Sequence, residues 1–132
     1  MADRSLVGED QKGRKILIVE DERDLALTCA RLLQRMGHVP LIALDGREAL
    51  ERIEAEAPDL ILTDLRLPEG DGLTVLRHAR SGARKIPVIL FTAYSSEPSR
   101  REAFEEGAAA YLCKPFSAAV LRAAVERALT AV

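Results

Sequence analysis

The sequence has little that would tie it to a membrane, an extracellular compartment or a nucleic acid. It contains no tryptophan and only two cysteines, and its formal net charge is −2 over 132 residues. This near balance of charge gives no electrostatic footprint for nucleic acid. No apolar run approaches the roughly 20 residues of a membrane span, and the N-terminus lacks the apolar core of a signal peptide. We expect a cytoplasmic protein that binds neither membrane nor nucleic acid.

The remaining composition is that of one globular domain. Apolar residues make up 48% of the chain and charged residues 30%, and the length fits a single domain. Residues 1–14 are polar and aperiodic, so we predict a flexible leader there and one domain over 15–132. Cys29 and Cys113 lie in predicted secondary structure without a C-x-x-C partner, and free, buried thiols are the expectation.

Five short apolar segments alternate with helical patterns along the chain. The predicted strands cover 15–19, 39–44, 59–63, 87–91 and 109–113, and the later helices cover about 97–106 and 117–131. Such alternation predicts an α/β fold with a parallel sheet and helices on both faces. Pro40 cannot donate a ladder hydrogen bond, which places the second strand at an edge. A flavodoxin-like, doubly wound sheet of order 2-1-3-4-5 satisfies this constraint.

Chemically active side chains follow the predicted strands directly. They are Glu20, Asp21, Asp64, Thr92 and Lys114. Right-handed crossovers place the carboxyl ends of all parallel strands at one rim, where open α/β sheets bind their ligands. We therefore expect these five side chains to converge, although nearly the whole chain separates the first from the last.

The predicted cluster is too acidic to stand alone. Two unit charges about 5 Å apart repel by roughly 3 kcal/mol at an effective dielectric constant of about 20, and the single ammonium of Lys114 does not balance three carboxylates. An all-oxygen site with few protein ligands suits Mg²⁺. Asp64 can also act as a nucleophile that forms an aspartyl phosphate, with Thr92 and Lys114 covering the phosphoryl oxygens.

Five short motifs follow one another at these positions. They are Ile-Val-Glu-Asp-Glu at 18–22, Leu-Thr-Asp-Leu-Arg-Leu-Pro at 62–68, Gly-Asp-Gly at 70–72, Phe-Thr-Ala at 91–93 and the segment 107–116, which ends in Lys-Pro-Phe. With these motifs, residues 15–131 resemble the receiver domain of bacterial two-component response regulators. The resemblance implies a signalling phosphoacceptor rather than an enzyme that turns over a substrate.

The resemblance also assigns roles at the rim. It implies that Asp64 is the phosphoacceptor, charged by a histidine kinase or a phosphotransfer protein, and that Asp21 binds Mg²⁺ directly. Glu20 would act through metal-bound water, and the backbone carbonyl of Arg66 would be a third metal contact. Lys114 would be the counter-charge of the phosphoryl group, joined to the next residue by a cis peptide bond.

A switch surface is implied as well. Thr92 and Tyr111 would be a coupled pair that alters the affinity of the fourth helix, fifth strand and fifth helix for an output partner. The acidic pair departs from the commoner two aspartates, since it begins with Glu20. Arg66 and Tyr94 stand at variable positions beside the phosphoryl group, and we hypothesise that they restrict water and set the lifetime of the aspartyl phosphate.

Three other functions fit these residues less well. A phosphatase of the haloacid-dehalogenase kind needs a second aspartate two residues after the nucleophile, where this chain has Arg66. A flavin binder needs a phosphate loop after the first strand, where the acidic residues 20–22 would repel a phosphate. A degenerate receiver used only for docking does not fit the presence of Asp64, Asp21 and Lys114.

Two expectations concern surfaces. The last helix has only a narrow polar stripe of Arg122, Glu126, Arg127 and Thr130, so we predict that part of it meets an output partner or a second copy in a homodimer. We expect His38 and His78 to lie on the surface, away from the rim. The sequence does not identify the kinase, the output or the pathway, and it leaves open whether the chain stands alone or is part of a longer regulator.

Overall fold

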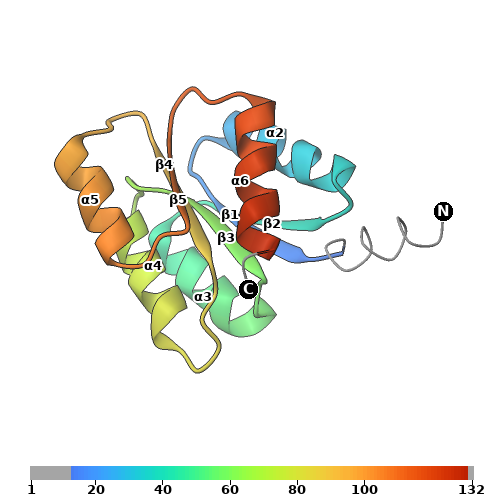
Figure 1. Ribbon diagram of the computed structural model, residues 1–132. Helices are drawn as coiled ribbons and strands as arrows, with labels where there is room; N and C mark the ends of the chain where they lie inside the picture. Colours follow the sequence, from blue (N-terminus) through green and yellow to red (C-terminus); the bar gives the residue numbers. More distant parts are fainter. Residues whose placement is uncertain (1–12, 131–132) are drawn as a thin grey trace.

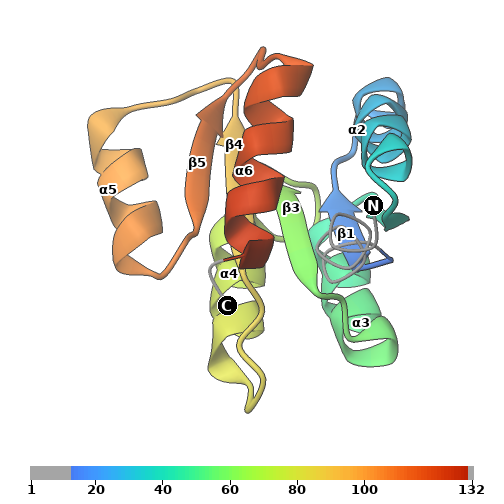
Figure 2. The ribbon, with the colours of Figure 1, turned by 45° about the vertical axis from the view of Figure 1, so that its right-hand side comes forward.

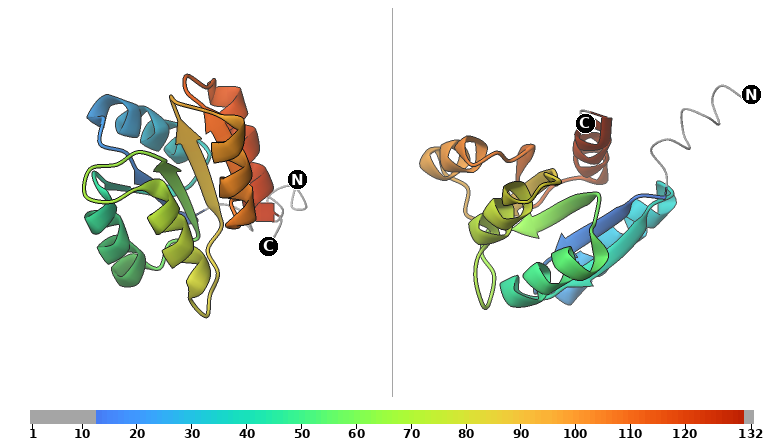
Figure 3. Two further views of the ribbon diagram at one scale, coloured as in Figure 1. Left: turned by 90° about the vertical axis from the view of Figure 1, so that its left-hand side faces the viewer. Right: turned by 90° about the horizontal axis from the view of Figure 1, so that it is seen from below.

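The computed structural model describes residues 13–130, which form one five-stranded sheet. The strands are β1 (Lys15–Val19), β2 (Val39–Ala43), β3 (Leu60–Asp64), β4 (Val88–Thr92) and β5 (Ala110–Cys113). All neighbouring strands are parallel and their order is β2-β1-β3-β4-β5 (Figure 1). The predicted fold is confirmed, with Pro40 in an edge strand. Because the strands are parallel, their carboxyl ends share one side of the sheet (Figure 3).

Helices connect the strands, and their capping residues mark where they begin. They are α2 (Arg23–Arg35), α3 (Gly46–Glu56), α4 (Gly72–Ser81), α5 (Glu97–Glu105) and α6 (Ala118–Thr130). Ser117 caps α6 as predicted, because its hydroxyl oxygen accepts a hydrogen bond from the backbone N–H of Val120 at 3.1 Å. Within residues 13–130, none of the helices has the length and apolar character that spanning a bilayer would require.

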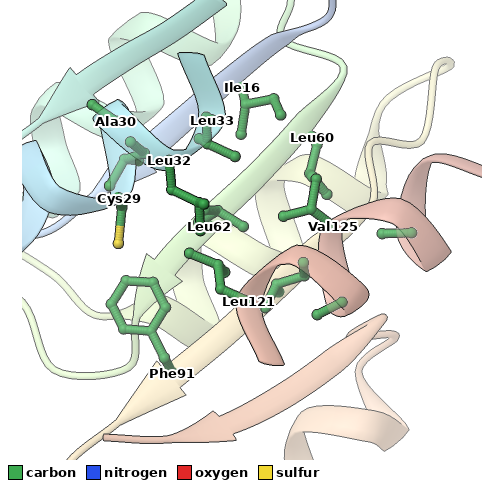
Figure 4. Close-up of a cluster of buried hydrophobic side chains, with 14 of the residues drawn as sticks. Ile16, Cys29, Ala30, Leu32, Leu33, Leu60, Leu62, Phe91, Leu121 and Val125 are labelled. Carbon is green, nitrogen blue, oxygen red and sulfur yellow. The ribbon is translucent and has the colours of Figure 1, made fainter. Parts of the chain in front are cut away.

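The helices cover both faces of the sheet. On one face α2 and α6 pack over β1, β3 and β4, and residues such as Leu33, Leu62, Phe91, Leu121 and Val125 interlock there (Figure 4). On the other face α3, α4 and α5 cover the alternate side chains of the same strands. The α5 and α6 helices lie on opposite sides of β5 (Figure 2). Successive side chains of each strand therefore pack on opposite faces of the sheet. The rim lies between these two layers, where the strands end.

Two side chains differ from expectation. Cys29 is buried, but Cys113 is exposed, because it ends the half-buried edge strand β5. His38 is buried rather than on the surface, since it lies between α2 and β2 with its Nδ1 atom unpartnered. Burial lowers the pKa of His38, and Arg14 adds to this effect. His78 lies at the surface as expected, where its Nε2 atom is 2.8 Å from Glu54 Oε2.

The structure limits two predictions, the one for the N-terminal leader and the one for the apolar surface of the last helix. Residues 13 and 14 of the predicted leader belong to the fold, because the backbone N–H of Gly13 donates to the Gly37 carbonyl at 2.7 Å and the Arg14 carbonyl accepts from the Val39 N–H at 2.9 Å. The rest of the predicted leader, residues 1–12, lies outside the described residues. The apolar arc of α6 is smaller than the sequence suggested, because Leu121 and four further apolar residues are buried against the sheet and α2. Val120, at 47% exposure, is the one large apolar side chain that α6 leaves to solvent within 118–130.

Candidate functional site

The acceptor candidate Asp64 ends the central strand β3 and is itself buried, with 7% of its surface exposed. Its Oδ1 atom accepts a hydrogen bond from the backbone N–H of Arg66 at 2.9 Å, which orients the carboxylate at the start of the loop. Gly72 passes directly behind this loop. A Cβ atom there would stand 2.4 Å from the Asp64 carbonyl oxygen, so only glycine fits.

Lys114 joins the two buried carboxylates of the rim. Its ammonium donates to Glu20 Oε1 at 2.7 Å and also to Asp64 Oδ2, although 94 residues separate it from Glu20. The backbone N–H of Lys114 donates to the Thr92 carbonyl at 2.8 Å, which continues the ladder between β4 and β5. The predicted cis bond between Lys114 and Pro115 is present. The convergence of these segments is therefore observed.

Burial and mutual contact alter the acid–base behaviour of this cluster. Desolvation raises the pKa of Glu20, which is 1% exposed, and the bonds that it accepts from Lys114 and the Glu22 N–H only partly offset the effect. Burial alone would lower the pKa of Lys114, but its hydrogen bonds to Asp64 and Glu20 outweigh burial and raise it. The ammonium also lies 5.3 Å from the centre of the Phe91 ring. Lys114 therefore stays charged at neutral pH.

The predicted metal ligands are partly assembled. Glu20 and Asp64 share Lys114, whereas Asp21 is exposed at the next position along the chain. Among residues 13–130, no three histidine, cysteine, aspartate or glutamate side chains are already placed to hold a metal ion. The donors are nevertheless all oxygen, the type that Mg²⁺ prefers, and the rim has an excess of negative charge. The residues thus fit Mg²⁺ in chemistry, and a bound ion would compete with Lys114 for the same oxygens.

The predicted switch pair lies on β4, which is next to β3, and on β5, which is next to β4. Thr92 is fully buried at the end of β4, and its Oγ1 atom accepts a hydrogen bond from the backbone N–H of Tyr94 at 3.0 Å. Its hydroxyl hydrogen therefore remains available to an acceptor on the rim. Tyr111 is half-buried on β5, and its hydroxyl lies 2.9 Å from Ser99 Oγ. No pattern in the sequence indicates this partner, since Ser99 stands in a polar helix.

Arg66 and Tyr94 meet in space above these strands. The guanidinium carbon of Arg66 lies 4.4 Å from the centre of the Tyr94 ring, and both side chains are exposed. Arg66 is tied to Asp64 through its backbone, and Tyr94 is tied to Thr92 in the same way. The two exposed side chains thus bridge the loops that follow Asp64 and Thr92.

Comparison with known proteins agrees with this geometry. Residues 16–126 match the response regulator receiver domain family over most of the chain. The chain belongs to this family. Receiver domains are the signalling modules of two-component systems, and the assignment confirms the resemblance drawn from the five motifs.

Relatives of known name are mostly longer proteins. The chain is 37% identical over 116 residues to the alkaline phosphatase synthesis transcriptional regulatory protein PhoP of Bacillus subtilis, covering 88% of this chain and 48% of that protein. It is 38% identical over 114 residues to the transcriptional regulatory protein ZraR of Escherichia coli (strain K12), covering 86% of this chain and 26% of that protein. The chain therefore spans about half or less of the length of these relatives.

Solved receiver domains share the whole fold. The signal receiver domain of a putative Luxo repressor protein from Vibrio parahaemolyticus superposes with a TM-score of 0.86 at 29% identity, covering 90% of this chain and 92% of that one. The BeF₃-activated N-terminal receiver domain of RstA from Klebsiella pneumoniae gives a TM-score of 0.80 at 34% identity, covering 87% and 97% of the two chains.

Proposed function

We propose that this receiver domain accepts a phosphoryl group on Asp64 from a histidine kinase or a phosphotransfer protein. The observation that carries the proposal is the placement of Lys114, whose ammonium contacts both Asp64 and Glu20 at the rim. A nucleophilic carboxylate beside a fixed cation at the end of a central strand is suited to phosphoryl transfer, which depends mainly on positioning and charge neutralisation.

The residues account for each part of the transfer. The carboxylate of Asp64 forms the new bond to phosphorus, while the bond between phosphorus and the donor breaks and its electron pair leaves with the donor. Lys114 shifts from the Asp64 carboxylate to a phosphoryl oxygen, where its charge is needed. The free hydroxyl hydrogen of Thr92 supplies a second donor to the phosphoryl group. The chain thereby catalyses only its own phosphorylation and dephosphorylation.

A divalent cation completes the charge balance in this proposal. Glu20, Asp21, Asp64 and the backbone carbonyl of Arg66 would hold Mg²⁺, with Glu20 acting through a bound water. When bound, the ion supplies the positive charge that offsets the phosphoryl oxygens during transfer. The buried position of Glu20 and its bond from the Glu22 N–H at 2.9 Å keep one acidic arm fixed for this purpose.

The output of the switch would be read on α5, β5 and α6. Thr92 moves toward the phosphoryl group, Tyr111 turns inward, and the surface changes its affinity for an effector or for a second copy of the chain. The phosphoryl group acts as a ligand that shifts an existing equilibrium by its contacts in one of two states. The output partner, a homodimer and a cytoplasmic location remain predictions.

Intact-mass spectrometry tests the phosphoacceptor directly. The protein is incubated with Mg²⁺ and acetyl phosphate, and we expect a mass increase of one phosphoryl group that does not occur when EDTA replaces Mg²⁺ in the incubation. Asp64→Asn is the matched control, because the amide keeps the shape of the side chain and lacks its nucleophilic charge. Equal labelling of Asp64→Asn, or no labelling of the wild type with Mg²⁺, would contradict the proposal.

A further inference from the structure

A serine on α5 holds the tyrosine of the switch. Tyr111 projects from β5, and its hydroxyl lies 2.9 Å from the hydroxyl of Ser99 in the first turn of α5. Both residues are half-buried, so the bond is partly shielded from water and is not simply exchanged for a solvent contact. Nothing in the five motifs of the family resemblance includes this serine.

The rest of α5 is held to the sheet by few contacts. Ala103 is the residue of α5 that is buried in the core, while Phe104 is 40% exposed. The backbone N–H of Ser99 is already used in the cap, where it donates to Ser96 Oγ at 3.2 Å. The hydroxyl of Ser99 takes no part in this cap bond. It contacts Tyr111 on β5 instead, and it links the start of the helix to the position of Tyr111.

The contact belongs to the arrangement in which Lys114 neutralises Asp64. In that arrangement Thr92 Oγ1 is engaged with the backbone N–H of Tyr94. For Tyr111 to turn toward Thr92, its hydroxyl must leave Ser99. The bond thus stabilises one of the two states between which the switch chooses, and it contributes nothing to the other.

We propose that Ser99 is a positioning residue that holds Tyr111 in the resting arrangement and so sets the phosphoryl occupancy at which the domain switches. The inference rests on the proposed function, because it assigns a regulator to the same switch. It requires that removal of the Ser99 hydroxyl favours the activated state, whereas a merely structural role would leave the balance unchanged or weaken the site.

Titration with a phosphoryl mimic measures the balance. Wild type, Ser99→Ala, Ser99→Thr and the neighbouring control Ser95→Ala are titrated with beryllofluoride and Mg²⁺. A net hydrogen bond is worth a factor of about two to ten, so Ser99→Ala should lower the midpoint about two- to tenfold. Ser99→Thr keeps the hydroxyl and should restore the wild-type midpoint. Ser95 is exposed in the preceding loop, and its replacement should change nothing.

The contact itself is followed by fluorine NMR on protein labelled with 3-fluorotyrosine. The chain has two tyrosines, so Tyr94→Phe assigns the Tyr111 resonance. Without the mimic, this resonance should move in Ser99→Ala and return in Ser99→Thr. An unmoved resonance, or a midpoint that is equal or higher in Ser99→Ala, would overturn the role of Ser99 while leaving the phosphoacceptor intact. If wild type and Asp64→Asn have the same midpoint in the beryllofluoride titration, the proposed function is contradicted, and so is the inference about Ser99 that rests on it.

Discussion

Replacing Lys114 by methionine tests how the acidic rim is stabilised. The ammonium lies 2.7 Å from Glu20 Oε1 and no farther than this from Asp64 Oδ2, so the two oxygens are at most about 5.4 Å apart. At an effective dielectric constant of about 20, that separation corresponds to a repulsion of roughly 3 kcal/mol. Glu20 is 1% exposed and Asp64 is 7% exposed, so water screens little of it. Lys114→Met removes the compensating charge and keeps most of the volume.

We expect Lys114→Met to lower the free energy of unfolding by about 3 kcal/mol in EDTA, or about 10 °C in Tm for a domain of this size. Thermal unfolding followed by circular dichroism at 222 nm measures this, since the chain has no tryptophan. The double variant with Glu20→Gln removes the repulsion and should recover most of the loss. Excess Mg²⁺ should also recover part of it. The reasoning is refuted if Lys114→Met is as stable as wild type in EDTA, or if Glu20→Gln adds no stability to it.

Two further predictions concern the contact between Arg66 and Tyr94 and the buried side chain of His38. Arg66→Ala and Tyr94→Ala should each speed loss of the phosphoryl group about two- to fivefold, because a cation–π contact of about 0.5–1 kcal/mol no longer covers the site; unchanged rates in both variants, measured by intact mass over time, would rule this out. Since the folded pKa of His38 lies below 6.5, the unfolded chain takes up the proton first as the pH falls. The contribution of neutral His38 to the free energy of unfolding should thus be fully present above pH 6.5 and decline below it. Urea unfolding should show a smaller decline in the free energy of unfolding for His38→Leu than for wild type, and an unchanged decline for His78→Leu.

Much of the fold was predictable because its signals are local. Pro40 alone placed β2 at an edge, and the alternation of apolar runs and helical patterns then left one familiar strand order. The rim residues were predictable for a related reason. Each lies at or just after the carboxyl end of a strand, so Asp64 and Lys114 could be brought together by topology without knowledge of any side-chain contact.

The predictions that failed depend on packing between distant elements. His38 lies in the turn between α2 and β2, and nothing local shows that the fold closes over it. Cys113 looked buried because it ends an apolar strand, but β5 is an edge strand that α5 covers thinly. The contact between Ser99 and Tyr111 depends on the rotation of α5 over β5, which helical periodicity in a polar segment does not fix.

Glu20 and Lys114 are 94 positions apart in the sequence, so the rim can form only after the chain between them has been synthesised. A nascent chain exposes Asp64 to the cell well before β5 and Lys114 have left the ribosome. During that interval Asp64 lacks the contact from Lys114, and the sheet lacks β5. The rim has therefore not yet formed. A chain that ends before Lys114 therefore lacks the assembled rim, and we expect no phosphorylation of Asp64 in it.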